Sequence, residues 1–178
     1  MATTYIALLR GINVGGRNKL PMAELKEIVS KAGGEAVRTY IQSGNVVYEA
    51  DEDLGSAISA ALEQEKELRV PVVTRTANQL AAVLAGNPFL KADPELDIKT
   101  LHVAFLAAAP TAEQVANLDP DRSPPDAFHV DGDVVYLSYP NGLGRSKLTN
   151  AYLDSKLKTV STVRNWKTCL KLAEMVGA

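Results

Sequence analysis

Two segments of this chain carry glycine, arginine and lysine at the same spacing, a combination suited to binding an anion. The segment from Asn13 to Leu25 recurs from Asn141 to Leu153, with seven of thirteen positions identical. Each copy contains a Gly-Arg-x-Lys motif, built from Gly16, Arg17 and Lys19 and from Gly144, Arg145 and Lys147. A guanidinium fork, an ammonium group and backbone amides accessible at glycine together favour phosphate or carboxylate. The repeat therefore predicts two anion-binding loops.

Each copy follows a strand-like run and precedes a helix-like pattern, so both are predicted at strand-to-helix crossings. The N-terminus of a helix adds unpaired amides and a partial positive charge, which favours anions there. A second interpretation stays open. The glycines can serve turns with positive φ, while the cations only interact with solvent.

The order of the patterns predicts an α+β fold of two related ferredoxin-like halves, each β-α-β-β-α-β with a mainly antiparallel sheet. In the first half, strands are expected at 4–10, 37–41, 46–50 and 71–75, with helices at 22–32 and 54–68. In the second, strands are expected at 100–107, 128–130 and 134–139, helices at 111–118 and 146–158, and a short connector or strand at 159–163. A final helix, capped by Thr162, carries Trp166 and Cys169 on its apolar face.

The predicted domain organisation has three parts. Residues 1–76 form the first unit, residues 77–99 a connecting helix and loop, and residues 100–178 the second unit with its C-terminal helix. The loops then occupy pseudo-equivalent crossings, one before the first helix of the first unit and one before the second helix of the second unit. This placement favours a common role.

Further polar residues complete the predicted ligand site, namely Arg10, Asn13, Ser43, Asn45 and Arg164. Ser43 and Asn45 fall in a hairpin turn, where such side chains also bond their own backbone. Arg164 precedes the last helix, where it can reach an anion or a neighbouring carboxylate. Both alternatives remain open for these residues.

Other chemistries find little support in the sequence. Gly11 to Asn18 has arginine and asparagine where a phosphate loop needs lysine and a hydroxyl. His129 and Asp131 alternate along a strand, but the Asp-Gly turn accounts for the acid without a metal. Cys169 is predicted to be a buried, inert thiol. No metal and no cofactor is predicted, and no catalytic residue can be assigned.

Charge and composition indicate a cytoplasmic protein without a membrane partner. The net charge is −2 over 178 residues, divided as +2 for residues 1–50, −9 for 51–133 and +5 for 134–178. The basic ends hold the two loops. A single cysteine fits a reducing compartment, and no apolar stretch approaches the about 20 residues that span a bilayer. We expect no secretory signal at the N-terminus, and the oligomeric state stays open.

Four motifs resemble the bacterial family known as domain of unknown function 1697. They are Leu9 to Gly16, Thr39 to Val47, Gly144 to Asn150 and Thr162 to Trp166. The resemblance covers essentially the whole chain and implies an α+β fold with two related ferredoxin-like halves. It implies no activity, substrate or catalytic residue.

These observations predict a protein that binds a phosphorylated or otherwise anionic ligand, either a nucleotide or a nucleic acid. Tyr5 and Tyr48 fall on central strands, as in RNA-binding sheets, but the paired aromatics of that signature are missing. One alternative is an enzyme acting on a phosphorylated or carboxylated small molecule. Another is a structural or interaction module, in which the loops bind nothing.

Overall fold

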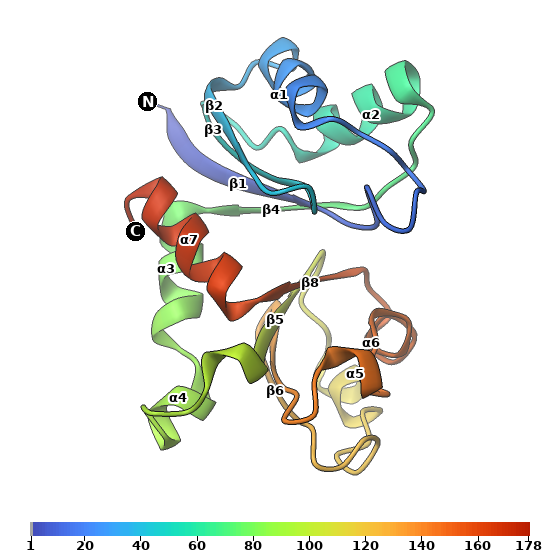
Figure 1. The fold of residues 1–178 in the computed structure, drawn as a ribbon, viewed down its shortest axis with the longest axis vertical. Helices are drawn as coiled ribbons and strands as arrows, with labels where there is room; N and C mark the ends of the chain where they lie inside the picture. Colours follow the sequence, from blue (N-terminus) through green and yellow to red (C-terminus); the bar gives the residue numbers. More distant parts are fainter. Residues whose placement is uncertain (1) are drawn as a thin grey trace. The chain divides into compact units, whose positions relative to one another are not determined.

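The computed structural model describes residues 2–178, which form an α+β structure with two four-stranded antiparallel sheets (Figure 1). The chain divides into two compact units. One contains the residues up to Ala81 together with Leu172–Ala178, and the other spans Ala82–Lys171. Each of the two Gly-Arg-x-Lys loops lies within its own unit.

The first unit contains six elements: β1 (Thr3–Leu9), α1 (Met22–Lys31), β2 (Glu35–Tyr40), β3 (Asn45–Ala50), α2 (Gly55–Lys66) and β4 (Val72–Thr76). Its strands lie in the order β2-β3-β1-β4, with every neighbouring pair antiparallel. Helices α1 and α2 cover one face of this sheet (Figure 1). Ala7 and Leu9 of β1 pack against that layer, while Ile6 and Leu8 are also buried. The central strand is therefore buried on both faces, as its continuous apolar run predicts.

The helix α3 (Ala77–Ala85) follows β4 and carries the chain into the second unit. That unit contains α4 (Pro88–Ala92), β5 (Leu101–Leu106), α5 (Ala112–Ala116), β6 (Ala127–Asp131), β7 (Val134–Ser138), α6 (Asn150–Leu157), β8 (Ser161–Asn165) and the start of α7 (Trp166–Val176). Two short 3-10 turns, η1 (Ile98–Thr100) and η2 (Leu143–Arg145), precede β5 and α6. The strand order is β6-β7-β5-β8, again antiparallel throughout.

The core of the second unit lies between its sheet and helices α5 and α6. Ala104 and Leu106 of β5 pack there with Leu137, Leu153 and Leu157, all essentially inaccessible to solvent. At one end of the sheet, Gly132 and Asp133 form the hairpin turn between β6 and β7, and Gly132 has a φ of 59°. The turn lies one residue later than the Asp131-Gly132 signal predicts, because Asp131 still pairs with Val134. The other end carries the second loop.

Two predicted helix starts are wrong. The helix expected from Ser146 begins at Asn150, because Thr149 accepts a hydrogen bond from the Tyr152 amide at 3.2 Å and so caps α6. The expected cap Thr162 lies inside β8, which extends to Asn165. Asn165 caps α7 instead, since its Oδ1 accepts a hydrogen bond from the Thr168 amide at 2.8 Å.

Candidate anion-binding site

The second Gly-Arg-x-Lys loop is held in one conformation by hydrogen bonds within the segment that joins β7 to α6. The Gly142 amide donates to the Tyr139 carbonyl at 2.9 Å, and the Ser146 amide donates to the Leu143 carbonyl at 3.1 Å. The buried Tyr139 hydroxyl donates to the Leu148 carbonyl at 2.8 Å, and burial raises the pKa of this phenol. Both ends of the loop are thereby fixed to the core.

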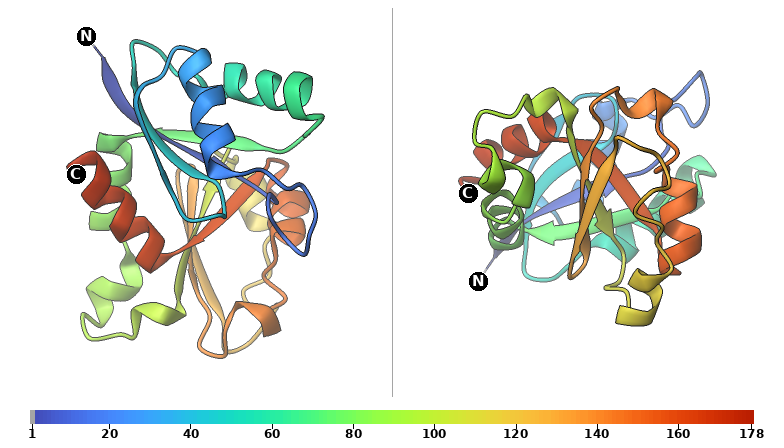
Figure 2. Two further views of the ribbon diagram at one scale, coloured as in Figure 1. Left: turned by 45° about the horizontal axis from the view of Figure 1, so that its top comes forward. Right: turned by 90° about the horizontal axis from the view of Figure 1, so that it is seen from below.

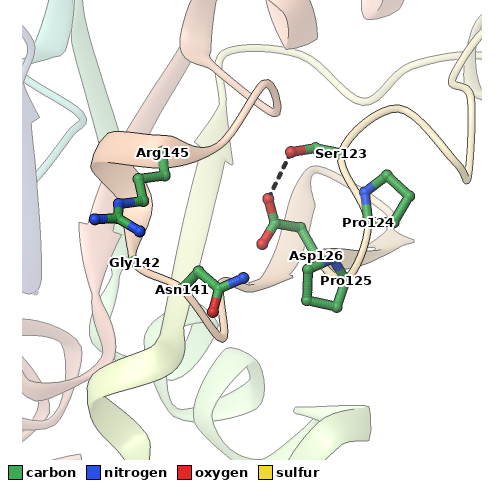
Figure 3. A pocket seen from close by; sticks show the side chains of 7 residues that line it. All are labelled: Ser123, Pro124, Pro125, Asp126, Asn141, Gly142 and Arg145. Atoms are coloured by element: carbon green, nitrogen blue, oxygen red, sulfur yellow. Dashed lines mark hydrogen bonds between the residues drawn. The ribbon is translucent and has the colours of Figure 1, made fainter.

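A cavity of about 90 Å³ opens beside this loop (Figure 3). It is several times the about 10–15 Å³ that one water molecule requires. Its walls come from two segments that are distant in sequence, and they contain Ser123, Pro124, Pro125, Asp126, Asn141, Gly142 and Arg145. The first four residues belong to the loop before β6, a segment that no sequence pattern connects with the repeat.

Hydrogen bonds join the two walls of this cavity. The Ser123 hydroxyl donates to Asp126 Oδ2 at 2.8 Å (Figure 3). It also accepts from the Lys147 amide at 3.0 Å. Ser123 therefore fixes the backbone of the Gly-Arg-x-Lys motif against the loop before β6. No local pattern in the sequence pairs Ser123 with Lys147, which are 24 residues apart.

The electrostatics of this cavity are mixed. Arg145 and Lys147 are exposed, and within residues 2–178 neither forms an ion pair. Arg145 can offer a planar fork of N–H donors to an oxyanion, and Asn141 adds an amide. Asp126 contributes a carboxylate, which repels an anion but accepts hydrogen bonds. The combination suits a ligand with both an anionic group and hydrogen-bond donors.

The first loop joins β1 to α1 and extends past the end of its strand, in blue in Figure 2. Asn13 organises it. Its amide nitrogen donates to the carbonyls of Leu20 and Gln42, both at 2.9 Å, and its Oδ1 accepts from the Leu20 amide at 2.7 Å. Asn18 closes the loop by donating to the Gly11 carbonyl at 2.9 Å. Asn13 thus holds the loop to the β2–β3 turn, a structural use of this predicted ligand residue.

The cations of the first loop lie on its surface. Gly16 has a φ of 77°, and its neighbours Arg17 and Lys19 are both exposed. The Arg17 amide donates to the Val14 carbonyl at 2.9 Å, which forms the turn at the tip of the loop. The side chains of both cations therefore remain available to a ligand in solution.

Ser43 and Asn45 make the hydrogen bonds expected of a turn. The buried amide of Asn45 donates to the Tyr40 carbonyl at 2.9 Å and to the Ser43 hydroxyl at 3.0 Å. Gly44 between them has a φ of 89°, and a Cβ there would lie 2.7 Å from Ile12 Cδ1. Only glycine fits this position. The turn therefore packs directly beneath the first loop.

Arg10 and Arg164 belong to the strand framework. Arg10 is half-buried just after β1, where its amide donates to the Pro71 carbonyl at 3.1 Å. Arg164 is buried on β8, and its guanidinium donates to the Val163 carbonyl at 3.1 Å. Burial lowers the pKa of Arg164 to about 10, partly offset by Cys169. Even so, the guanidinium stays charged at neutral pH.

The predicted site residues thus gather in two groups, one in each unit. In the first unit, Asn13 connects the loop that carries Gly16, Arg17 and Lys19 to the turn of Ser43 and Asn45. In the second unit, Arg145 lines the cavity, and Lys147 meets Ser123 through its backbone. In both copies the lysine lies three residues before the first residue of the helix.

The aromatic residues considered for base stacking are part of the core. Tyr5 and Tyr48 stack on each other with ring centroids 5.5 Å apart, and Tyr48 is fully buried. Tyr48 belongs to the core cluster that also contains α1 and α2 residues, and the partly buried Tyr5 packs against that cluster. Burial raises the pKa of Tyr48, whose hydroxyl accepts from the Leu54 amide at 3.3 Å. Tyr48 is therefore closed to a nucleic-acid base.

The remaining candidate groups are potential metal ligands and the single thiol. Between Ala2 and Ala178, no three potential metal ligands from histidine, cysteine, aspartate and glutamate lie together. Cys169 is buried and free, as predicted, and burial raises the pKa of its thiol to about 12. In the same part of the chain, no helix is long and apolar enough to cross a membrane.

The molecule is thus an α+β protein with two four-stranded antiparallel sheets and a basic loop beside a small polar cavity. A family model described as "Protein of unknown function (DUF1697)" matches residues 2–136, and the chain belongs to this family. The match includes the first loop and ends before the second.

A solved structure, of the conserved bacterial protein SP0830 from Streptococcus pneumoniae, has a similar fold. The TM-score is 0.70, the sequence identity is 23%, and the similarity covers 100% of both chains. No curated protein matches the chain.

Proposed function

We propose that this protein binds a small phosphorylated or otherwise anionic ligand through its Gly-Arg-x-Lys loops, with the Arg145 cavity as the principal site. The observation that carries the proposal is the position of Arg145. Its side chain lines a fixed cavity with Asn141 and Gly142, and no ion pair within the described residues neutralises it. Guanidinium groups in such positions bind oxyanions through paired N–H donors.

We also propose that the two units are ferredoxin-like repeats related by duplication. Their identical strand order supports this, since β5 to β8 follow the same order as β1 to β4. The basic loops need a separate explanation. Equivalent strands β1 and β5 begin 98 residues apart, whereas the loops recur at an offset of 128. Because the two offsets differ, a tandem duplication of the units would not place the two loops at equivalent positions. Their similar sequences therefore favour a common ligand chemistry.

The cavity favours the phosphate group of a small molecule over a nucleic acid, because its volume of about 90 Å³ holds a phosphate group, while the rest of a nucleotide or sugar phosphate would lie at its opening. Asp126 can accept hydrogen bonds from ligand hydroxyl or amino groups, while Arg145 binds the phosphate. Burial of Tyr48 removes one of the two stacking platforms that a sheet-bound single strand would use. The free, buried Cys169 is compatible with the reducing cytoplasm as the location.

Thermal unfolding with inorganic phosphate and with adenosine monophosphate tests the proposal. Both ligands should raise the melting temperature at constant ionic strength. At a ligand concentration of 100 times Kd, the folded state should gain about 2.7 kcal/mol of stability. Arg145→Glu should abolish most of the shift. Lys156→Glu makes the same charge change at an exposed position on α6 outside the cavity, and should retain it. Equal shifts in both variants, or none in the parent protein, would refute the proposal.

A further inference from the structure

We propose a second ligand site in this protein, for a small organic anion that carries one carboxylate or phosphate group. It occupies a cavity of about 290 Å³ in the second unit, at the end of the β5–β8 ribbon. The cavity is lined by Asp97, Ile98, Lys99, His102, Asn165 and Lys167. None of these residues contributes to the Arg145 cavity, so this site stands independently of the function proposed above.

Three elements build the cavity. His102 of β5 lies opposite Asn165 of β8 in the antiparallel register, so the two side chains project from the same face of the sheet. The turn η1 immediately before β5 supplies Ile98 and Lys99, and α7 starts directly after Asn165 and supplies Lys167. Strand pairing therefore fixes the floor of the cavity, while a turn and a helix place one lysine each beside it.

The polar groups divide into those already used and those left for a ligand. Asp97 Oδ1 accepts from the Lys99 amide at 3.0 Å, and Asn165 Oδ1 accepts from the Thr168 amide at 2.8 Å. The Asn165 amide hydrogens make no hydrogen bond within residues 2–178. His102 Nδ1 is buried and has no partner of good geometry in this range. The ring is held edge-on against Tyr139, with centroids 5.0 Å apart.

The charges around the cavity favour an anion. Lys99 and Lys167 are exposed and form no ion pair in the described part of the chain, and Asp97 is the one acid among the lining residues. Ile98 leaves 37% of its surface exposed beside these cations, a position that favours an apolar portion of the ligand. A volume of about 290 Å³ lies at the lower end of the range for ligand pockets, which limits the ligand to a small metabolite.

The single tryptophan of the chain provides a direct readout. Trp166 is buried and lies in the sequence between the lining residues Asn165 and Lys167, so we expect its fluorescence to change when the cavity fills. Titration with benzoate and with phenyl phosphate should give saturable changes, and the matched neutral compound benzamide should bind at least about tenfold more weakly, a difference of about 1.4 kcal/mol. Inorganic phosphate tests whether the site recognises the organic part of the ligand. It should bind more weakly than phenyl phosphate, whereas equal binding would indicate a simple ion site.

Paired variants separate this site from general surface charge. Lys99→Gln with Lys167→Gln should weaken binding of both organic anions by about tenfold or more. Lys91→Gln with Lys156→Gln removes the same charge at exposed positions outside the cavity and should leave binding within about twofold. Arg145→Glu should also leave this titration unchanged, even where it abolishes phosphate binding at the other site. The proposal is overturned if the anions give no saturable change, or if the two lysine pairs behave alike.

Discussion

Individual polar residues in the first loop serve the fold more directly than the sequence indicates. Asn13 was a candidate ligand residue because it precedes the Gly-Arg-x-Lys motif. Its side chain makes three hydrogen bonds, to Leu20 twice and to Gln42 once. Neither partner is adjacent in sequence, so no local pattern could predict this role. The loop cations are therefore carried by a segment that these bonds connect to the β2–β3 turn.

Replacing Asn13 by alanine should lower the free energy of unfolding by about 1–3 kcal/mol, because the Leu20 amide and two carbonyls lose their partner. Urea denaturation monitored by circular dichroism measures the effect. Lys26→Ala, at an exposed position on α1, should change stability by less than about 0.5 kcal/mol. A similarly small effect of Asn13→Ala would show that the loop does not depend on these bonds.

His102 should make stability sensitive to pH. Burial lowers its pKa, and the Thr100 backbone, which favours the protonated ring, offsets this only in part. In the pH range between this lowered native pKa and the ordinary histidine pKa of about 6.5, the unfolded chain therefore binds more protons than the native chain. Stability from this group is present above that pH and is lost as the pH falls toward the native pKa.

The measurement compares free energies of unfolding at several pH values between about 7.5 and 5.5, a range that brackets the ordinary histidine pKa. His102→Gln should show a smaller loss on acidification than the parent protein, because glutamine does not titrate. His129→Gln makes the same substitution at an exposed position on β6 and is the matched control. Parallel curves for the parent and His102→Gln would contradict the assignment.

At the scale of elements, hydrophobic period and turn residues predicted most of the architecture. The apolar run of β1 indicated a buried central strand correctly, and the Asp-Gly signal placed the β6–β7 hairpin to within one residue of its turn at Gly132 and Asp133. Helix starts were harder to predict, because several residues near each start can serve as caps. Thr149 caps α6 in place of Ser146, and Asn165 caps α7 because Thr162 pairs within β8. These choices depend on tertiary contacts, which the local sequence does not contain.

The candidate site was predictable only in part for the same reason. The repeat identified Arg145 and Lys147 because both belong to a local motif. Ser123 and Asp126 lie in a Pro-rich loop whose relation to the motif depends on the tertiary fold. A single sequence contains no signal for that contact.

Capping of α6 yields a prediction about the second loop. Thr149→Ala removes the acceptor of the Tyr152 amide and should cost about 0.5–2 kcal/mol of stability, typically about 1. Thr149→Ser keeps a hydroxyl acceptor and should lose much less. Thermal denaturation of the three proteins provides the measurement. If alanine and serine have equal effects, the hydroxyl does not cap the helix.

At the scale of the whole molecule, charge is distributed in a way that suits the proposed function. The net charge of −2 combines an acidic middle with basic ends, and the basic ends carry both loops. A chain of low net charge does not attract polyanions strongly, whereas local cations can still bind a single phosphate. Binding should therefore depend only mildly on salt, unlike the steep dependence of proteins that neutralise many nucleic-acid phosphates.

The most direct test of anion binding by the loops is a titration of the isotopically labelled protein with inorganic phosphate, followed through backbone amide resonances. If the loops bind phosphate, the amide resonances of Gly144 and Arg145 should show saturable chemical-shift changes, and those of Gly16 and Arg17 should form a second such set. The same titration of Arg145→Glu should lose the first set and keep the second. Shifts that stay linear with phosphate, or that spread evenly over exposed lysines, would contradict it.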